Sequence, residues 1–409
     1  MRKVLVYGYS SESNYGGVSL ILGFRELLRA VDPAAEMICV EDGPVPIFAH
    51  KEHDFQSIRW PYSGIKRFWM DYVKFRLFGR KPRNPDRAAW WEWFAVADTV
   101  VALQGIAFCS KIGRKSGRLP ALSACAGVFR DYSPNLAARL MGKRSIKSTC
   151  SLGPMDRWDV RLAARICARF VFDAVVARED ESARWMRKVA GERSVLAVGP
   201  DIANLMPVPS ARPEPNLIGI VPSFQMERQW SCVEIGYLDC MAGLIEHACA
   251  RGFRVWLLPN QDKVRHSRLP RRSDTRVAQD ILARLPKGAD VEIRPICGRS
   301  GLDRKTDFAR CTLLVSPRYH TCVSAMTCGV PTITLGWHCK YGELLRLYGQ
   351  EAWLFSSERC SLSVLTDAVD RMFADHVCIS RKILSRGNDV REATVRIGRR
   401  MLSDGRFMI

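Results

Sequence analysis

The chain has 409 residues, too many for one ordinary hydrophobic core, so we expect two domains. Hydrophobic residues make up 47% of it and charged residues 25%, which excludes a disordered or low-complexity chain. With 62 Lys and Arg against 42 Asp and Glu, the net charge is +20. This excess indicates either an anionic partner, such as a phosphorylated substrate, a membrane surface or nucleic acid, or simply a basic solvated surface.

The sequence predicts neither a secretory segment nor a membrane span. The opening MRKVLVYGYS has a short apolar run that leads into polar sequence, which is typical of a buried first strand. No apolar stretch approaches the roughly 20 residues that a spanning helix needs. The 15 Cys are scattered without a CxxC pair, and neither they nor the seven His fall at metal-ligand spacing. We therefore expect a cytoplasmic protein that binds no metal.

In the first half of the chain, strands alternate with helices. A strand at 3–9 leads through a polar turn at 10–17 to a helix at 18–31, and a strand follows at 36–40. The alternation resumes later with strands at 99–103, 147–151, 174–177 and 194–198, and with helices at 157–172 and 179–189. The stretch MPVPSARPEPN, with four prolines, then predicts a linker, which we place at 206–214.

Residues from about 55 to 95 interrupt this alternation, with aromatic and basic residues interleaved. One interpretation is a pair of helices packed on the first domain with their aromatic rings inward. The other is an amphipathic surface that rests on an anionic membrane. Base stacking with nucleic acid fits the composition, but no nucleic-acid motif is present.

After the linker the alternation starts afresh. Strands are expected at 217–221, 254–259, 291–294, 311–315 and 331–335, with helices at 232–251, 276–285, 321–328 and near the C-terminus. Two such blocks predict an α/β protein of two doubly wound, Rossmann-like domains, at 1–205 and 215–409, facing across a cleft. The terminal helices are candidates for packing back on the first domain.

The most informative stretch is CTLLVSPRYHTCVSAMTCGVPTITLG, which predicts a strand, a short loop and a helix. The loop SPRYH places Arg318 and His320 at a strand's carboxyl end and a helix N-terminus, where free backbone N–H groups favour an anion. The planar Arg318 guanidinium suits phosphate or carboxylate, and His320 can donate to the anion or transfer a proton near neutral pH. The alternative is a surface Arg beside a His that caps the helix.

This stretch resembles the C-terminal signature of the polysaccharide pyruvyl transferase family: strand, Arg-x-His, small-residue helix, Gly-Val-Pro, strand and a loop with Lys, here Lys340. Three further segments resemble the family in order. They are GYSSESNYGGVSLILGF with Asn14, Gly16 and Gly17; CSLGPMDRWDVRLAARICARFVFDAVVAREDESARWM with Arg178, Glu179 and Ser182; and PDIANLM. The chain departs from the family at Gly17, where Asp is usual, at the reduced Gly-rich turn around Gly105, and at Ser316-Pro317.

The resemblance implies transfer of the enolpyruvyl group of phosphoenolpyruvate to hydroxyls of a saccharide, free or lipid-linked, as a cyclic ketal, without a further cofactor. It makes Arg318 and His320 the catalytic candidates. The substrate-binding candidates are Asn14, Gly16, Gly17, Arg178, Glu179, Ser182 and Lys340. The two arginines would grip the donor from the two domains, and His320 would neutralise or protonate the departing phosphate. Glu179 would orient Arg178, serve as a base, or be an exposed carboxylate at a helix start.

Two alternatives remain open. A glycosyltransferase that uses a nucleotide sugar shares this GT-B-like architecture, and fold does not fix function. It would need a carboxylate late in the second domain for the base or ribose, for which Glu343 is the one weak candidate. A non-catalytic protein that binds an anionic surface would need its basic residues gathered on one face.

Overall fold

The computed structural model describes residues 1–8, 14–41, 55–110, 120–262, 273–296, 299–336, 338 and 340–403. Residues 10–13 of the predicted turn lie outside this range. The chain forms two compact units. Unit 1 comprises Met1–Glu12, Arg25–Ile202 and Ala393–Ile409, and unit 2 comprises Ser13–Phe24 and Ala203–Glu392. Each unit is an α/β domain and is described by itself.

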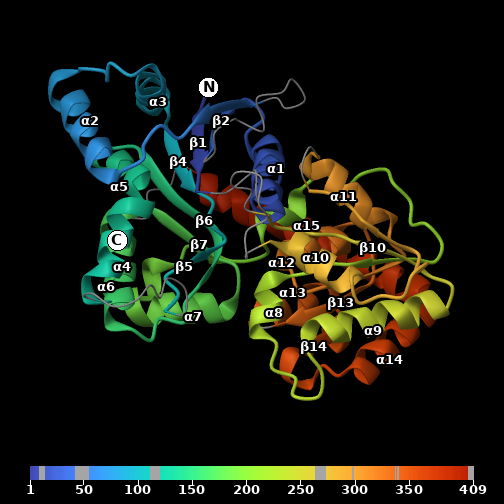
Figure 1. The fold of residues 1–409 in the computed structure, drawn as a ribbon. Helices are drawn as coiled ribbons and strands as arrows, with labels where there is room; N and C mark the ends of the chain where they lie inside the picture. The colour runs from blue at the N-terminus through green and yellow to red at the C-terminus, as the bar shows by residue number, and fades with distance from the viewer. Residues whose placement is uncertain are drawn as a thin grey trace. The chain divides into compact units, whose positions relative to one another are not determined.

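Unit 1 is built on an eight-stranded parallel sheet with the order β3-β2-β1-β4-β6-β7-β8, and β5 pairs with β6 (Figure 1). The strands are β1 (Lys3–Tyr7), β2 (Glu36–Glu41), β3 (Gln56–Arg59), β4 (Thr99–Ala102), β5 (Ile106–Ala107), β6 (Arg144–Leu152), β7 (Ala174–Ala177) and β8 (Ala197–Val198). The strand order reverses between β1 and β4, and such a switch point is where doubly wound sheets bind ligands.

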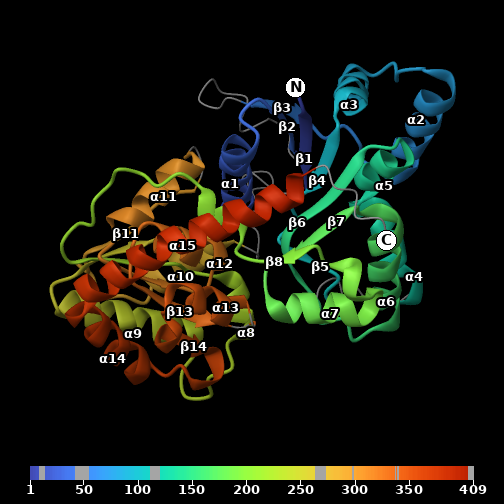
Figure 2. The ribbon, with the colours of Figure 1, turned by 180° about the vertical axis from the view of Figure 1, so that it is seen from behind.

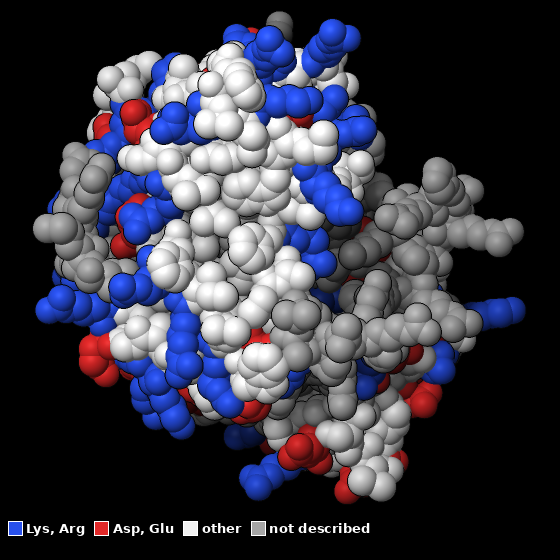
Figure 3. Space-filling model, turned by 90° about the vertical axis from the view of Figure 1, so that its left-hand side faces the viewer, with Lys and Arg blue, Asp and Glu red and all other residues white. Residues whose placement is uncertain are grey.

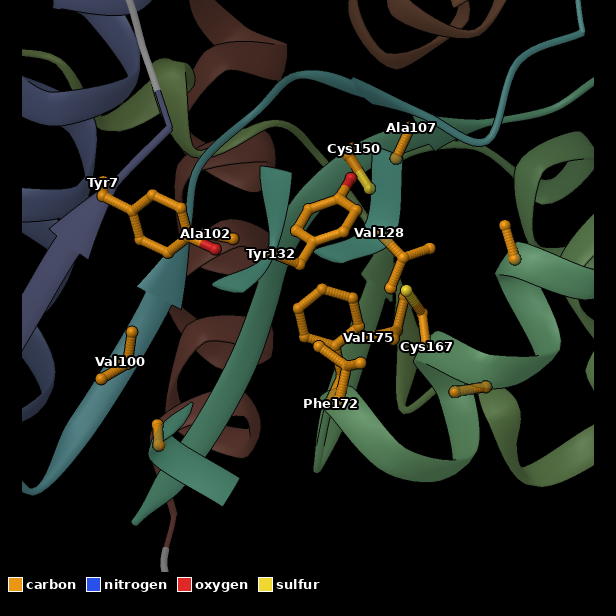
Figure 4. Close-up of a cluster of buried hydrophobic side chains, with 14 of the residues drawn as sticks. Tyr7, Val100, Ala102, Ala107, Val128, Tyr132, Cys150, Cys167, Phe172 and Val175 are labelled. Atoms are coloured by element: carbon orange, nitrogen blue, oxygen red, sulfur yellow. The ribbon is translucent and has the colours of Figure 1, made fainter. Parts of the chain in front are cut away.

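Helices cover this sheet and close its core. They are α2 (Ile65–Phe78), α3 (Pro85–Val96), α4 (Pro120–Asp131), α5 (Ser133–Leu140), α6 (Trp158–Ile166), which continues into a π-helical turn at Cys167–Val171, and α7 (Asp180–Ala190). Figure 4 shows part of the core, in which the Tyr132 and Phe172 rings meet edge to face with centroids 5.1 Å apart. Such aromatic pairs contribute beyond the area they bury.

The aromatic-basic segment forms β3, α2 and α3. Phe68, Trp90, Trp91 and Phe94 are fully buried, and the Trp91 indole donates to the Tyr62 hydroxyl at 2.6 Å. The prediction of two packed helices with their aromatic rings inward is therefore confirmed. The outward side of α2 differs from the inward side, because its apolar residues are exposed.

Unit 2 repeats the architecture with a six-stranded parallel sheet of order β11-β10-β9-β12-β13-β14. Figure 2 labels β11, β13 and β14 of this sheet. Its strands are β9 (Leu217–Ile220), β10 (Arg254–Leu257), β11 (Val291–Ile293), β12 (Leu313–Ser316), β13 (Thr332–Gly336) and β14 (Leu354–Ser356). Its helices are α8 (Phe224–Gln229), α9 (Tyr237–Ala250), α10 (Asp274–Leu282), α11 (Gly301–Arg310), α12 (Tyr319–Thr327), α13 (Lys340–Tyr348) and α14 (Leu362–Ala374). The prediction of two doubly wound parallel-sheet domains is confirmed.

Two helices contribute to both units, namely α1 (Tyr15–Val31) and α15 (His376–Leu402). The division falls after Ile202, while the predicted linker at 206–214 lies within unit 2. There Met206 is fully buried, and Glu214 pairs with Arg254 and Arg310. The two ends of the Pro-rich stretch are thus held in unit 2, while Val208 between them is 54% exposed.

Two predicted boundaries near the candidate residues are wrong. The helix expected at 18–31 begins at Tyr15, because the Asn14 side chain accepts the N–H of Gly16 at 3.0 Å and so starts the helix before the glycines. The loop expected at 316–320 consists only of Pro317 and Arg318, so His320 lies in the first turn of α12.

Candidate functional site

The first group of candidate residues gathers in unit 2, at the junction of β12 and α12. Arg318 is the N-cap residue of α12, and its N–H donates to the Ser316 hydroxyl at 3.1 Å. The first N–H groups of a helix have no partner within the helix and carry partial positive charge. The backbone of Arg318 therefore opens a helix N-terminus, a feature that favours anions.

A buried carboxylate, Asp274, holds the Arg318 guanidinium in place. Asp274 is fully buried and forms an ion pair with Arg318 Nη2. Its oxygens also accept the N–H groups of Phe224 at 3.0 Å and of Gln261 at 2.9 Å. Burial raises the pKa of the Asp274 carboxyl, and Arg318 and the backbone donors oppose that shift. Asp274 thus ties together the carboxyl ends of β9, β10 and β12, which flank the switch point of this sheet.

The groups that surround the Arg318 guanidinium leave one of its donors without an acceptor in the described part of the chain. Its carbon lies 5.1 Å from the centroid of the Phe224 ring, and Nη1 is 3.4 Å from the Gln261 side-chain oxygen. Among the residues that the structure describes, the buried Nε of Arg318 meets no hydrogen-bond acceptor. A phosphate or carboxylate oxygen would satisfy this donor.

The start of α1 belongs to the same cluster. The backbones of Asn14 and Gln261 form an isolated antiparallel β-bridge, and the N–H of Tyr15 donates to the Asn260 carbonyl at 3.1 Å. Gly16 lies so close to His320 that a Cβ at this position would be 2.5 Å from the imidazole Nδ1. Only glycine permits this approach, so Gly16 fixes the space in which the His320 ring lies. The N–H of Gly17 donates to the Asn14 carbonyl at 3.0 Å and is therefore already engaged.

Lys340, the first residue of α13, borders this cluster. Its side chain is mostly buried, and Nζ lies 5.6 Å from the Tyr319 ring centroid and 5.3 Å from that of Tyr341. The Tyr341 hydroxyl donates to the Pro317 carbonyl at 2.6 Å, which attaches α13 to the Arg318 turn. Glu343, the carboxylate considered for a nucleotide, instead pairs with Arg346 at 2.5 Å on the same helix.

The second group of candidates lies in unit 1, at the carboxyl end of β7. The Arg178 guanidinium is 2% exposed and is held on three sides. It donates to Glu179 at 2.9 Å, to Asp201 at 2.5 Å and to the Ser151 hydroxyl at 2.5 Å. These bonds join β6, β7 and the segment after β8. Direct contact of Arg178 with a ligand stays a prediction, as does its sharing of one site with His320.

Glu179 is an oriented, ionised carboxylate and not an exposed one. It is buried and accepts the Ser151 and Ser182 hydroxyls, each at 2.5 Å. Burial alone would raise the pKa of Glu179, but Arg178 and these hydroxyls lower it below its usual value. A lowered pKa makes a weak base, so the geometry fits the orienting role better. Ser182 also accepts the Leu152 N–H at 2.8 Å and so attaches α7 to β6.

A pocket of about 660 Å³ opens at the switch point of unit 1, where β1 and β4 end. Aromatic rings and polar groups line it, among them Tyr7, Trp60, Tyr62, Gln104, Arg130 and Tyr132. Lys147 donates to the Gln104 carbonyl at 2.5 Å and so fixes this turn. The Oε1 atom of Gln104 is buried and accepts no hydrogen bond from any residue in the described part of the chain. The pocket therefore offers aromatic faces, with an unsatisfied acceptor oxygen buried in its wall.

Sequence reasoning missed the residues that hold the arginines, namely Ser151, Asp201, Gln261 and Asp274. A weak signal existed for some of them. PNQD and PDIAN place polar residues directly after predicted strands, where ligand-binding edges are expected. Among the described residues, no three or more His, Cys, Asp or Glu side chains group so as to hold a metal ion. Over the same range, no helix has the length and apolar character of a bilayer span.

The two parallel-sheet domains place the protein in the class of proteins with the GT-B fold, which is built from two Rossmann-like domains. Solved structures share this fold at very low identity. A UDP-GlcNAc 2-epimerase from Methanocaldococcus jannaschii is 12% identical with a TM-score of 0.54, over 91% of this chain and 93% of that one. A putative UDP-N-acetylglucosamine 2-epimerase from Listeria monocytogenes is 10% identical with a TM-score of 0.59, over 97% and 94%. A transferase from Siraitia grosvenorii in complex with UDP is 10% identical with a TM-score of 0.53, over 98% and 100%.

The family is narrower than the fold. The model of the family described as polysaccharide pyruvyl transferase matches residues 14–338, which include every candidate residue of unit 1 and all those of unit 2 except Lys340 and Glu343. The chain therefore belongs to the polysaccharide pyruvyl transferase family and is a transferase. No curated protein matches it closely enough to serve as a relative.

Proposed function

We propose that the protein transfers the enolpyruvyl group of phosphoenolpyruvate to two hydroxyls of a saccharide, forming a cyclic pyruvate ketal and releasing phosphate. The observation that supports this most directly is the Arg318 turn. It combines a guanidinium fixed by Asp274, a buried Nε donor that lacks an acceptor among the described residues, and a helix N-terminus. These features suit a small, multiply charged anion.

The proposed chemistry has a balanced course. An acid protonates the methylene carbon of the donor, which leaves an oxocarbenium-like centre at the neighbouring carbon. A sugar hydroxyl adds there and loses its proton, the bond from that carbon to the phosphate oxygen breaks, and a second hydroxyl closes the ketal with loss of another proton. A positioned acid or base typically contributes about 10²–10⁴-fold to such steps.

The residues divide these tasks by their chemistry. Arg318 binds the phosphate, and Lys340 adds positive charge beside it. His320, held against Gly16, protonates the phosphate as it departs, since imidazole titrates near neutral pH. Asp274 orients Arg318, and Asn14 and Gly16 complete the wall around His320.

We place the saccharide acceptor, free or lipid-linked, in the unit 1 pocket. Aromatic rings such as Trp60 and Tyr62 pack against the apolar faces of sugar rings, and the Gln104 Oε1 accepts a hydroxyl. The alternative activity, a glycosyl transfer from a nucleotide sugar, uses the same fold. In unit 2, however, its weak carboxylate candidate, Glu343, is engaged with Arg346.

Titration calorimetry with phosphoenolpyruvate and with UDP-glucose and UDP-N-acetylglucosamine tests the donor. We expect phosphoenolpyruvate to bind and Arg318→Ala to weaken it about 10- to 150-fold, because a charge-assisted hydrogen bond contributes about 1.5–3 kcal/mol. Arg346→Ala, which removes an exposed arginine of unit 2, is the matched control and should leave the affinity unchanged. Binding of a UDP-sugar without phosphoenolpyruvate would support the glycosyltransferase instead.

The acceptor site is tested separately by transfer kinetics, with ³¹P NMR of released phosphate and ¹³C NMR of the ketal carbon. Methyl pyranosides that present a 4,6-diol serve as acceptors. Gln104→Leu keeps the side-chain bulk but removes the acceptor oxygen. We expect it to raise the KM for the saccharide about 5- to 50-fold, because a sugar hydroxyl loses its partner, while the affinity for phosphoenolpyruvate stays the same. An unchanged saccharide KM would remove the pocket from the acceptor site.

A further inference from the structure

The helix α2 has two apolar sides, and only one of them is covered within unit 1. Its inward side buries Phe68 and Tyr72. Its outward side carries Met70, Val73 and Leu77, which follow one another at spacings of three and four residues and so share one face. They are 58%, 46% and 68% exposed, and Phe78 at the end of the helix is 67% exposed. Four large apolar side chains in two turns are more than scattered surface residues explain.

This apolar face extends beyond α2. A shallow groove joins it to α4, where Phe129 is 47% exposed. α4 in turn packs against α6, whose Trp158 is 56% exposed. Figure 3, which faces the side of unit 1 that carries these helices, shows a broad area of uncharged residues bordered mainly by Lys and Arg. We call the exposed apolar residues of α2 together with Phe129 the α2 face.

The charges around the α2 face are mostly positive. Between Ile65 and Pro85 the chain has seven basic residues, all exposed, and one acidic residue. The basic residues are Lys66, Arg67, Lys74, Arg76, Arg80, Lys81 and Arg83. The one acidic residue of this range, Asp71, is buried and paired with Arg87 at 2.8 Å. Just beyond the range, Asp86 is exposed, and the exposed Glu92 pairs with Lys81 at 2.8 Å, so the other six basic residues carry the outward excess.

We infer that the α2 face docks unit 1 on an anionic lipid bilayer, with Met70, Val73, Leu77 and Phe78 in the interface and the basic residues at the phosphate level. The combination of exposed apolar residues and surrounding basic residues favours an anionic bilayer over other partners. An apolar face rimmed by Lys and Arg is the pattern of helices that lie in the membrane interface, and anionic lipids attract each basic residue near the surface. A second copy of the chain would bring the same positive rim against it, and the aliphatic Met70, Val73 and Leu77 offer no ring on which a nucleic-acid base could stack.

Vesicle cosedimentation of the full chain tests the inference. The vesicles are phosphatidylcholine alone and phosphatidylcholine with phosphatidylglycerol at a ratio of about 3:1, each at low and high salt. We expect binding to the anionic vesicles that is at least about tenfold stronger than to the neutral ones and that weakens with salt. Two variants separate the contributions. Leu77→Ser/Phe78→Ser removes apolar area, and Lys66→Gln/Lys74→Gln/Arg80→Gln removes charge; each should reduce binding at least about fivefold.

Matched variants in unit 2 control for general changes in hydrophobicity and charge. Val233→Ser/Val377→Ser removes two exposed valines, and Lys287→Gln/Arg359→Gln/Arg386→Gln removes three exposed charges; both should bind like the wild type. Circular dichroism confirms that each variant is folded. Absence of binding to anionic vesicles, equal binding to neutral ones, or insensitivity to the α2 variants would overturn the inference.

Two further results would give the α2 face a different partner and would also overturn it. Light scattering that shows a dimer dispersed by Leu77→Ser/Phe78→Ser would make it an interface between copies. Binding of duplex DNA that needs the basic residues but not Leu77 and Phe78 would make it a nucleic-acid surface. None of these experiments measures the transfer reaction. The inference can therefore fail while the proposed activity is correct, and the proposed activity can fail while the inference is correct.

Discussion

At the scale of single residues, the cluster in unit 2 depends on a contact that only glycine permits. Gly16 lies in the first turn of α1, and a Cβ there would be 2.5 Å from His320 Nδ1. That distance is well inside van der Waals contact, so an added methyl group must push the imidazole aside. Because Gly16 makes this contact with its backbone alone, its effect on chemistry is exerted through the position of His320.

We therefore predict that Gly16→Ala and His320→Gln each lower kcat at least about tenfold, with less than about a threefold change in phosphoenolpyruvate affinity. Because the added methyl group is crowded, thermal unfolding followed by circular dichroism must show that Gly16→Ala is folded at the assay temperature. Gly387→Ala in α15 is the control, since its nearest neighbour would be 4.0 Å away. Steady-state kinetics decide the matter, and an unchanged kcat would show that the position of the imidazole is immaterial.

At the scale of elements, apolar runs made the fold predictable. β7 (Ala174–Ala177) has the bounds that the sequence predicts, and β4, β9 and β12 shift by a few residues at most. Each is a buried run of four residues, and all but β4 lead directly into a helix. Burial on both faces of a parallel sheet produces such apolar runs directly. Arg318 and His320 were found for the same reason, because they follow such a run.

The contacts that orient the site could not be predicted in this way. Asp274 meets Arg318 across 44 positions of sequence, and Arg178 meets Asp201 across 23. No periodicity connects such residues, because the sheet order, not the local sequence, brings strand ends together. The helix start at Tyr15 was missed for a local reason: two glycines suggested a turn, but the Asn14 cap and the packing of Gly16 on His320 stabilise a helix.

At the scale of the whole molecule, the basic residues that give the net charge of +20 are of two kinds. Most are exposed and shape how the surface meets anionic partners, as around the α2 face. A few are buried, and a buried lysine whose pKa is shifted links the stability of the fold to pH. Lys305 on α11 is fully buried and donates to the Met206 carbonyl at 2.8 Å, and the structure pairs it with no carboxylate among the described residues.

Burial lowers the pKa of Lys305 to about 8, and nearby Arg391 adds to the shift. In the unfolded chain a lysine titrates near 10.4, so between about pH 8 and 10.4 the unfolded state holds a proton that the folded state has lost. Stability must then rise with pH across this window, by up to about 3 kcal/mol in total.

We predict that the unfolding free energy of the wild type, measured by urea titration and compared with Lys305→Met, increases by this amount from pH 7 to 10.5. Subtracting the unfolding free energy of the variant from that of the wild type cancels the titration of other groups. For the control Lys287→Met, which replaces an exposed lysine, this difference should not change with pH. A flat difference for Lys305→Met as well would mean that Lys305 stays charged in the folded protein, held by its carbonyl partner despite the burial.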